Sequence, residues 1–201
     1  MRPDGTGLRQ LTSFQSFNFR YEGDIFALPD DHATVSPDGK RVLFSSSWSD
    51  DNGVLGGIVD SDNYEVFIMN INGTNLRRLT NSPGFDGEAV FSPDGTKIAY
   101  VSECGGETAS QCVLHESIYI MDPNGNILQR VTSSSFSDVE PAWHPDGTKV
   151  AYTRVTVEGG PKVGDEQKHI RITDADGLNK NDRLLFDALV PCLASSLTEA
   201  T

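Results

Sequence analysis

The residues with the clearest capacity for chemistry are acidic ones in a polar stretch in the first third of the chain. Asp50, Asp51, Asp60 and Asp62 lie within the segment Trp48–Asn63. Carboxylate and amide oxygens are the ligands that Ca²⁺ prefers. The regular twelve-residue calcium loop, with Gly at its sixth position and Glu at its twelfth, is absent. The segment therefore predicts either a Ca²⁺ site or a solvated acidic loop, and no other cofactor is expected.

Three cysteines offer redox chemistry. Cys104 and Cys112 bracket a polar run of seven residues, which predicts a surface loop that a disulfide would close. Such a bond needs an oxidising compartment, and two unrelated reduced thiols are the alternative. Cys192 lies in a C-terminal segment, where it is either an idle thiol or half of a bridge between two copies of the chain.

The sequence contains no recognisable catalytic motif. The Gly-x-Ser-x-Gly elbow of serine hydrolases and the His-Glu-x-x-His pair of zinc peptidases are both missing. The four histidines are scattered along the chain. We therefore expect a protein that is not an enzyme.

The elements that would position these residues come from a sequence repeat. One phrase holds a Pro-Asp-Gly turn, in which Pro sets φ and Gly accepts a positive φ, followed by an alternating apolar strand. It is joined, always in the same order, by a second strand, a hairpin dipeptide and a Leu-x-x-Leu-Thr-like phrase. The members are Pro37, Pro93 and Pro145, then Val66–Asn70, Ile118–Asp122 and Ile170–Asp174, and then 8–12, 76–80 and 128–132. Each unit predicts four antiparallel strands and almost no helix.

These phrases resemble the TolB-like β-propeller repeat, and the match covers about residues 4–186. The resemblance implies an all-β fold of four-stranded antiparallel blades. The innermost strand would precede Ser-Pro-Asp-Gly, and the outermost would hold Leu-x-x-Leu-Thr. It also implies an extracellular or periplasmic location, although the N-terminus carries no apolar signal-peptide segment. Relatives of this kind dock other proteins or form the gate of a serine peptidase.

The number of blades predicts how the chain is used. The repeat gives about three blades, at 30–80, 86–132 and 138–186, with an orphan outer strand at 8–12 and a tail at 187–201. Propellers close with about four to eight blades, so three would leave apolar sheet faces bare at both ends. We therefore predict self-assembly into an oligomer or filament by strand pairing and blade-face contacts. A fragment of a TolB-like docking protein or of a peptidase gate is the alternative.

Apolar residues outside the regular blades are the candidates for contacts between copies. The insertion within 13–31 is rich in aromatic residues, which suit either a contact surface or a local core. The predicted intersubunit residues are Leu8, Leu11, Phe14, Phe17, Phe19 and Cys192.

The repeat also aligns three polar residues just before the Ser-Pro-Asp-Gly phrase. His32, Glu88 and Glu140 occupy the same position in successive units. They are predicted to lie in one ring near the inner strands and to face the central channel. There they would bind a cation or a basic segment, or serve only a structural role.

The net charge and the hydropathy of the chain limit the classes of partner that it is expected to bind. The 201 residues carry a formal charge of −13, which repels phosphate backbones and disfavours nucleic-acid binding. No run of 18 apolar residues is present, so no membrane span is expected. Other proteins, including copies of the same chain, remain the expected partners.

Overall fold

A computed structural model of the chain describes residues 10–12, 18–21, 24–27, 30–47, 64–105, 115–157 and 166–187. Every regular element in these ranges is a β-strand, and the ranges contain no helix. It follows that the described part offers no helix long and apolar enough to cross a bilayer.

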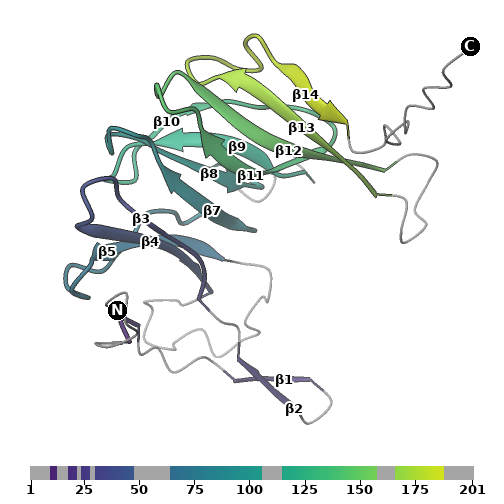
Figure 1. Cartoon of the computed structure of the whole chain (residues 1–201). Coiled ribbons are helices and arrows are strands. Elements are labelled where there is room, and N and C mark those ends of the chain that lie inside the picture. Colours follow the sequence, from purple (N-terminus) through teal and green to yellow (C-terminus); the bar gives the residue numbers. More distant parts are fainter. Residues whose placement is uncertain are drawn as a thin grey trace, which may run out of the picture.

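Twelve of the strands form three four-stranded sheets, in which neighbours along the chain pair antiparallel. The predicted all-β, blade-type fold is thereby confirmed, with the innermost strand ahead of each Ser-Pro-Asp-Gly-type turn. Figure 1 shows the sheets following one another in chain order. Blade 1 consists of β3 (Asp31–Val35), β4 (Arg41–Ser46), β5 (Glu65–Asn70) and β6 (Arg77–Arg78). Blade 2 consists of β7 (Asp86–Phe91), β8 (Ile98–Ser102), β9 (Ser117–Met121) and β10 (Ile127–Arg130). Blade 3 consists of β11 (Ser137–Trp143), β12 (Lys149–Val157), β13 (Glu166–Asp174) and β14 (Arg183–Asp187).

The Pro-Asp-Gly phrase forms the turn between the first two strands of each blade. In blade 1, Ser36 Oγ donates to Asp38 Oδ1 at 2.6 Å, and Gly39 has a φ of 69°. The same hydroxyl accepts from the backbone N–H of Arg41 at 2.9 Å. Each polar group of the turn is thus satisfied locally, which fixes where β3 ends and β4 begins.

Apolar residues that alternate along the strands build a core between successive blades. Leu43, Val66 and Ile68 of blade 1 pack with Ile98 and Tyr100 of blade 2. The opposite face of blade 2 packs on blade 3 through a second cluster. Its fully or nearly fully buried members are Ala99, Val101, Ile118, Ile120, Val131, Val150, Tyr152 and Ala175.

The outer face of blade 1 departs from the prediction of a bare flank. Val42, Phe44, Phe67 and Met69 on that face are buried within the single chain. Leu11, predicted to contact another copy, instead packs on this cluster together with Leu76. Residues 10–12 adopt no strand, and the other two residues of the predicted orphan strand at 8–12 lie outside the described residues. Removing apolar surface from water is favourable, and the apolar cluster that Leu11 packs against belongs to its own chain.

Blade 3 exposes apolar side chains on its two outer strands. Ile170 is 38% exposed, and Leu184 and Leu185 on β14 are 48% and 50% exposed. β14 itself lies where the repeat predicted a degraded outer strand.

The aromatic insertion contains a separate hairpin. β1 (Asn18–Tyr21) pairs antiparallel with β2 (Asp24–Ala27), and Phe19 lies opposite Phe26. Phe14 and Phe17 fall outside the described residues, so their predicted contact role is still a prediction.

Candidate docking site on the inner strands

Each blade's innermost strand carries a bulge at the same place. The pairing register shifts between Asp31 and Thr34 in β3, between Gly87 and Val90 in β7, and between Val139 and Ala142 in β11. The residues inside these bulges have left-handed backbones, with φ of 51° at His32, 52° at Glu88 and 55° at Glu140. Left-handed backbone is unfavourable for residues with a Cβ, so its threefold repetition points to a selected feature.

The three bulges bring their polar side chains together. The backbone N–H of Glu140 donates to Glu88 Oε2 at 2.5 Å. His32 Nε2 lies 3.9 Å from Glu88 Oε1 on the other side. Glu140 in turn accepts a hydrogen bond at Oε2 from Thr153 Oγ1 at 2.8 Å. The residues that the repeat aligned are therefore neighbours, with Glu88 in the middle.

A cavity of about 300 Å³ opens beside this trio. Its lining combines the three polar residues with Ala33, Thr34, Val90 and Pro141. Apolar walls with a few convergent polar groups are typical of a ligand-binding cavity. The site is therefore concave, acidic on one side and apolar on the other.

Burial dominates the electrostatics of Glu88. Its side chain is 17% exposed, whereas that of His32 is 46% exposed. Removal from water raises the pKa of Glu88, and the hydrogen bond from Glu140 and the nearby His32 oppose that rise. Glu88 is thus a carboxylate held in a place where an incoming positive charge would stabilise its ionised form.

Two hydrogen bonds between blades hold the bulges in place. Thr34 Oγ1 donates to the carbonyl oxygen of Ala89 at 2.8 Å. Trp143 Nε1 donates to the carbonyl oxygen of Val90 at 3.2 Å. Both bonds end on β7, so the inner strands of blades 1 and 3 are fixed to the strand that carries Glu88.

Sequence reasoning aligned the trio but missed the bulges and the supporting Thr153 and Trp143. The available signal was a titratable residue recurring at one position just before the Ser-Pro-Asp-Gly-type phrase of each repeat. Such a residue has to leave the pleat or face an opening, and the bulges satisfy both conditions.

Most of the other predicted site residues lie outside the part of the chain that the structure describes. Cys104 is buried, with 3% exposure, at the end of β8. Its predicted partner Cys112 lies outside the described residues, and so do Asp50, Asp51, Asp60, Asp62, Leu8 and Cys192. Within the described ranges no group of three or more His, Cys, Asp or Glu side chains is arranged to hold a metal ion. The disulfide and the Ca²⁺ site remain predictions.

Comparison with known proteins defines the family. No family model matches the sequence. A protein TolB homolog of Chlorobium chlorochromatii is 34% identical over 175 residues, covering 70% of this chain and 37% of the relative. The structure of TolB from Acinetobacter baumannii matches with a TM-score of 0.58 and 25% identity over 91% of this chain and 36% of that chain. A putative TolB from Agrobacterium tumefaciens gives a TM-score of 0.59 and 26% identity over 80% of this chain and 50% of that one.

The chain belongs to the TolB-like β-propeller repeat family. Its three four-stranded sheets are TolB-like blades, and the trio lies on the inner strands of these blades in this chain. The chain spans between 30% and 44% of the length of the curated relatives it matches.

Proposed function

We propose that this TolB-like chain is a non-enzymatic, periplasmic docking module that holds a basic side chain of a partner protein at its inner-strand cavity. The convergence of His32, Glu88 and Glu140 on one cavity is the observation that carries the proposal. Membership of the TolB-like family supports a protein partner over a small substrate, and this agrees better with the docking alternative than with self-assembly.

The chemistry of docking follows from the position of Glu88. Its carboxylate is largely removed from water, and a guanidinium or ammonium entering the cavity would replace the lost hydration with a charge-assisted hydrogen bond. Glu140, which is exposed, would supply a second carboxylate. Because the bulges are fixed by hydrogen bonds between blades, little order has to be created on binding. The net charge of −13 would also steer a basic partner toward the chain.

A peptide probe tests this function. We expect an unstructured, fluorescently labelled peptide with a single arginine to bind saturably in an anisotropy titration. The same peptide with citrulline in place of arginine should bind more weakly, because citrulline lacks the positive charge. Glu88→Gln should weaken arginine-peptide binding by about tenfold.

Asp176→Asn is the matched control, since it removes one negative charge from an exposed hairpin whose Asp176 pairs only with Lys180. It should leave binding within about twofold. Equal affinity of the arginine and citrulline peptides, or an unchanged affinity in Glu88→Gln, would contradict the docking function.

Self-association is the second candidate function, and one observation favours it. Ile170, Leu184 and Leu185 leave apolar surface at the outer edge of blade 3. Light scattering on the parent chain and on Leu184→Ser should show larger species only in the parent. A purely monomeric, folded parent would rule this candidate out and leave the docking proposal intact.

A further inference from the structure

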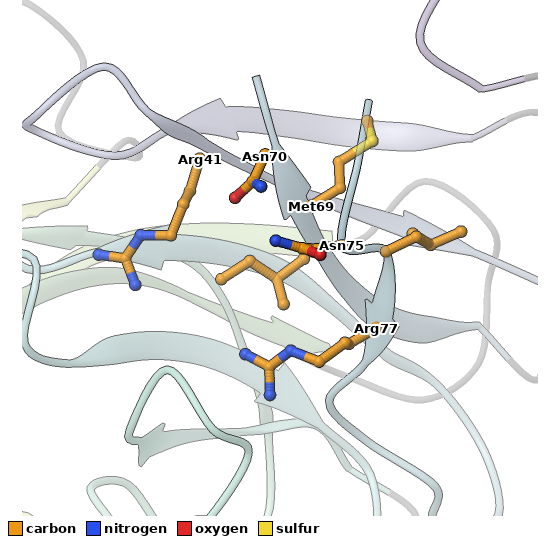
Figure 2. A pocket seen from close by; sticks show the side chains of 7 residues that line it. Arg41, Met69, Asn70, Asn75 and Arg77 are labelled. Atoms are coloured by element: carbon orange, nitrogen blue, oxygen red, sulfur yellow. The ribbon is translucent and has the colours of Figure 1, made fainter. Parts of the chain in front are cut away.

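A second cavity, separate from the inner-strand site, lies at the β5–β6 hairpin of blade 1. It has a volume of about 390 Å³ and is lined by Arg41, Asn70, Asn75 and Arg77 over Ile68, Met69 and Leu76. Figure 2 shows the two guanidinium groups extending to the same side of the pocket, with the amide of Asn75 beside them. Two cations and two amides thus line one concave surface of a chain whose net charge is −13.

Backbone groups of blade 2 hold both arginines in place. Arg41 Nη2 donates to the carbonyl oxygen of Gly95 at 3.3 Å, and its guanidinium lies 5.1 Å from the centre of the Phe91 ring. Arg77 Nη2 donates to the carbonyl oxygen of Pro123 at 3.0 Å. A carbonyl or an aromatic ring positions a guanidinium but leaves its full charge in place, along with most of its five N–H donors.

Neither arginine forms an ion pair with another described residue, whereas Arg78, Arg154 and Arg171 each do. The charge of Arg41 is felt by Asp38, but that carboxylate is held by Ser36 Oγ at 2.6 Å and by the N–H of Lys40 at 3.1 Å. None of the seven lining residues is acidic.

The repeat provides an internal control for this arrangement. The positions of Arg41, Asn70 and Arg77 are occupied in blade 2 by Lys97, Asp122 and Gln129, whose charges cancel. In blade 1 the same three positions carry two positive charges, because asparagine replaces the aspartate and arginine replaces the glutamine.

Blade 3 shows what the aspartate does where it is present. Lys149, which corresponds to Arg41, forms an ion pair with Asp174, which corresponds to Asn70. Asn181 Nδ2 donates to the same aspartate at 2.5 Å. The repeat therefore neutralises its lysine internally, and blade 1 has lost the neutralising group while keeping the cation.

We propose that the blade 1 pocket binds a small oxyanion, a carboxylate or phosphate group, between Arg41 and Arg77. The planar fork of a guanidinium matches the paired oxygens of either group. The Asn75 amide adds a neutral donor, and so does the N–H of Asn70 that is not used in the 2.9 Å hydrogen bond from its Nδ2 to Thr74 Oγ1. The apolar lining residues Ile68, Met69 and Leu76 would contact the carbon part of an organic anion. Blades 2 and 3 have an aspartate at the position of Asn70. The bound oxyanion would supply the negative charge that this aspartate supplies there.

An NMR titration of the whole chain at low ionic strength tests the proposal, with inorganic phosphate and succinate as separate probes. We expect saturable shifts of the Arg41 and Arg77 Nε–Hε signals with at least one probe, and the stronger probe identifies the preferred group. Asn70→Asp restores the repeat's own aspartate and should weaken binding by at least about tenfold. The variant should fold, because Asp122 already occupies this turn in blade 2 and accepts from the N–H of Asn124 at 2.7 Å.

Asn72→Asp is the matched control on the same hairpin. Asn72 does not line the pocket, and its side-chain oxygen accepts hydrogen bonds from Thr74 N at 3.0 Å and from Thr74 Oγ1 at 2.7 Å. An aspartate oxygen can accept both of these bonds. This variant should bind within about threefold of the parent. Two results would overturn the proposal: no saturable shift with either probe, or equal losses in Asn70→Asp and Asn72→Asp.

Discussion

The junction between blades 1 and 2 and the junction between blades 2 and 3 come from the same repeat but handle buried charge in opposite ways. At the first, Glu65 and Asp86 are 2% and 1% exposed. Arg78 Nη2 donates to Glu65 Oε1 at 2.6 Å, and Thr80 Oγ1 donates to Glu65 Oε2 at 2.7 Å. Asp86 accepts from Ser82 Oγ at 2.5 Å, while its Oδ1 is buried without a hydrogen-bond partner. Arg78 therefore pairs with Glu65, and Asp86 is held by the Ser82 hydroxyl without an ion pair to a described residue.

At the second junction, Asp138 takes the position of Asp86 and is completely buried. Arg154 donates to it twice, from Nε at 2.7 Å and from Nη2 at 2.9 Å. The position of Glu65 is occupied by Ser117, which accepts from Arg130 Nη2 at 2.8 Å. Every buried charge here has its own counter-charge or a neutral partner.

One residue position accounts for the difference between the two junctions. Arg154 is the cross-strand partner of Asp138, and Ser102 is the cross-strand partner of Asp86. A serine carries no charge, so Asp86 has no cross-strand counter-charge. Burial therefore raises the pKa values of both Glu65 and Asp86. The second junction neutralises its aspartate with the ion pair to Arg154. The same fold thus buries acidic groups in two ways, with raised pKa values at the first junction and with a counter-charge at the second.

Removing the arginine of the second junction should have the largest effect. Arg154→Ala leaves Asp138 charged, buried and unpaired, which costs about 3 to 5 kcal/mol of unfolding free energy. Urea unfolding of the parent and the variant measures the loss. Arg183→Ala, at an exposed position on β14, is the control and should change stability by less than about 0.5 kcal/mol. A loss below about 1 kcal/mol in Arg154→Ala would mean that the ion pair does not support the junction.

The sequence predicts the blades well because their signals are local. Pro37, Pro93 and Pro145 open turns whose hydrogen bonds lie within five residues, so a short phrase is enough to locate them. The bulge at Glu88 and the place of Leu11 depend on contacts between distant parts of the chain. The sequence lists Ser102, but it does not show that this uncharged residue is the partner of a buried aspartate. That becomes evident only when β7 pairs with β8 and buries Asp86 beside Ser102. Long-range pairing is the information that a periodic pattern does not carry.

A disulfide beside the first junction would add a covalent link where the cross-strand partner of Asp86 is the uncharged Ser102. Cys104 follows β8 directly, its N–H donates to Ser102 Oγ at 3.1 Å, and its Sγ contacts the carbonyl oxygen of Pro83. We predict a bond from Cys104 to Cys112, and closing so short a loop stabilises by about 2 to 3 kcal/mol. Reductant should therefore lower the melting temperature of the parent and leave Cys104→Ser unaffected. Equal free-thiol counts with and without reductant in the denatured chain would exclude the bond.

The pH dependence of the first junction gives the smallest of the three effects. Burial raises the pKa of Glu65 from 4.5 to about 7, and the charge of Asp86 adds to the rise. Between these values the folded state holds a proton that the unfolded chain has released. Stability is therefore highest toward pH 4.5 and falls as the pH rises through 7. The exposed turn carboxylates Asp94 and Asp146, whose pKa is about 2, titrate below this window.

Glu65→Gln should remove most of that slope, because a neutral amide is buried equally well at every pH. Between pH 5 and pH 8 we expect the melting temperature of the parent to fall by roughly 5 °C more than that of the variant. Asp86 and Glu88, whose pKa values are also raised, leave the variant a residual slope of the same sign. If the melting temperatures of the parent and the variant changed equally between pH 5 and pH 8, Glu65 would be ionised in the folded state throughout this range. Its raised pKa would then be contradicted.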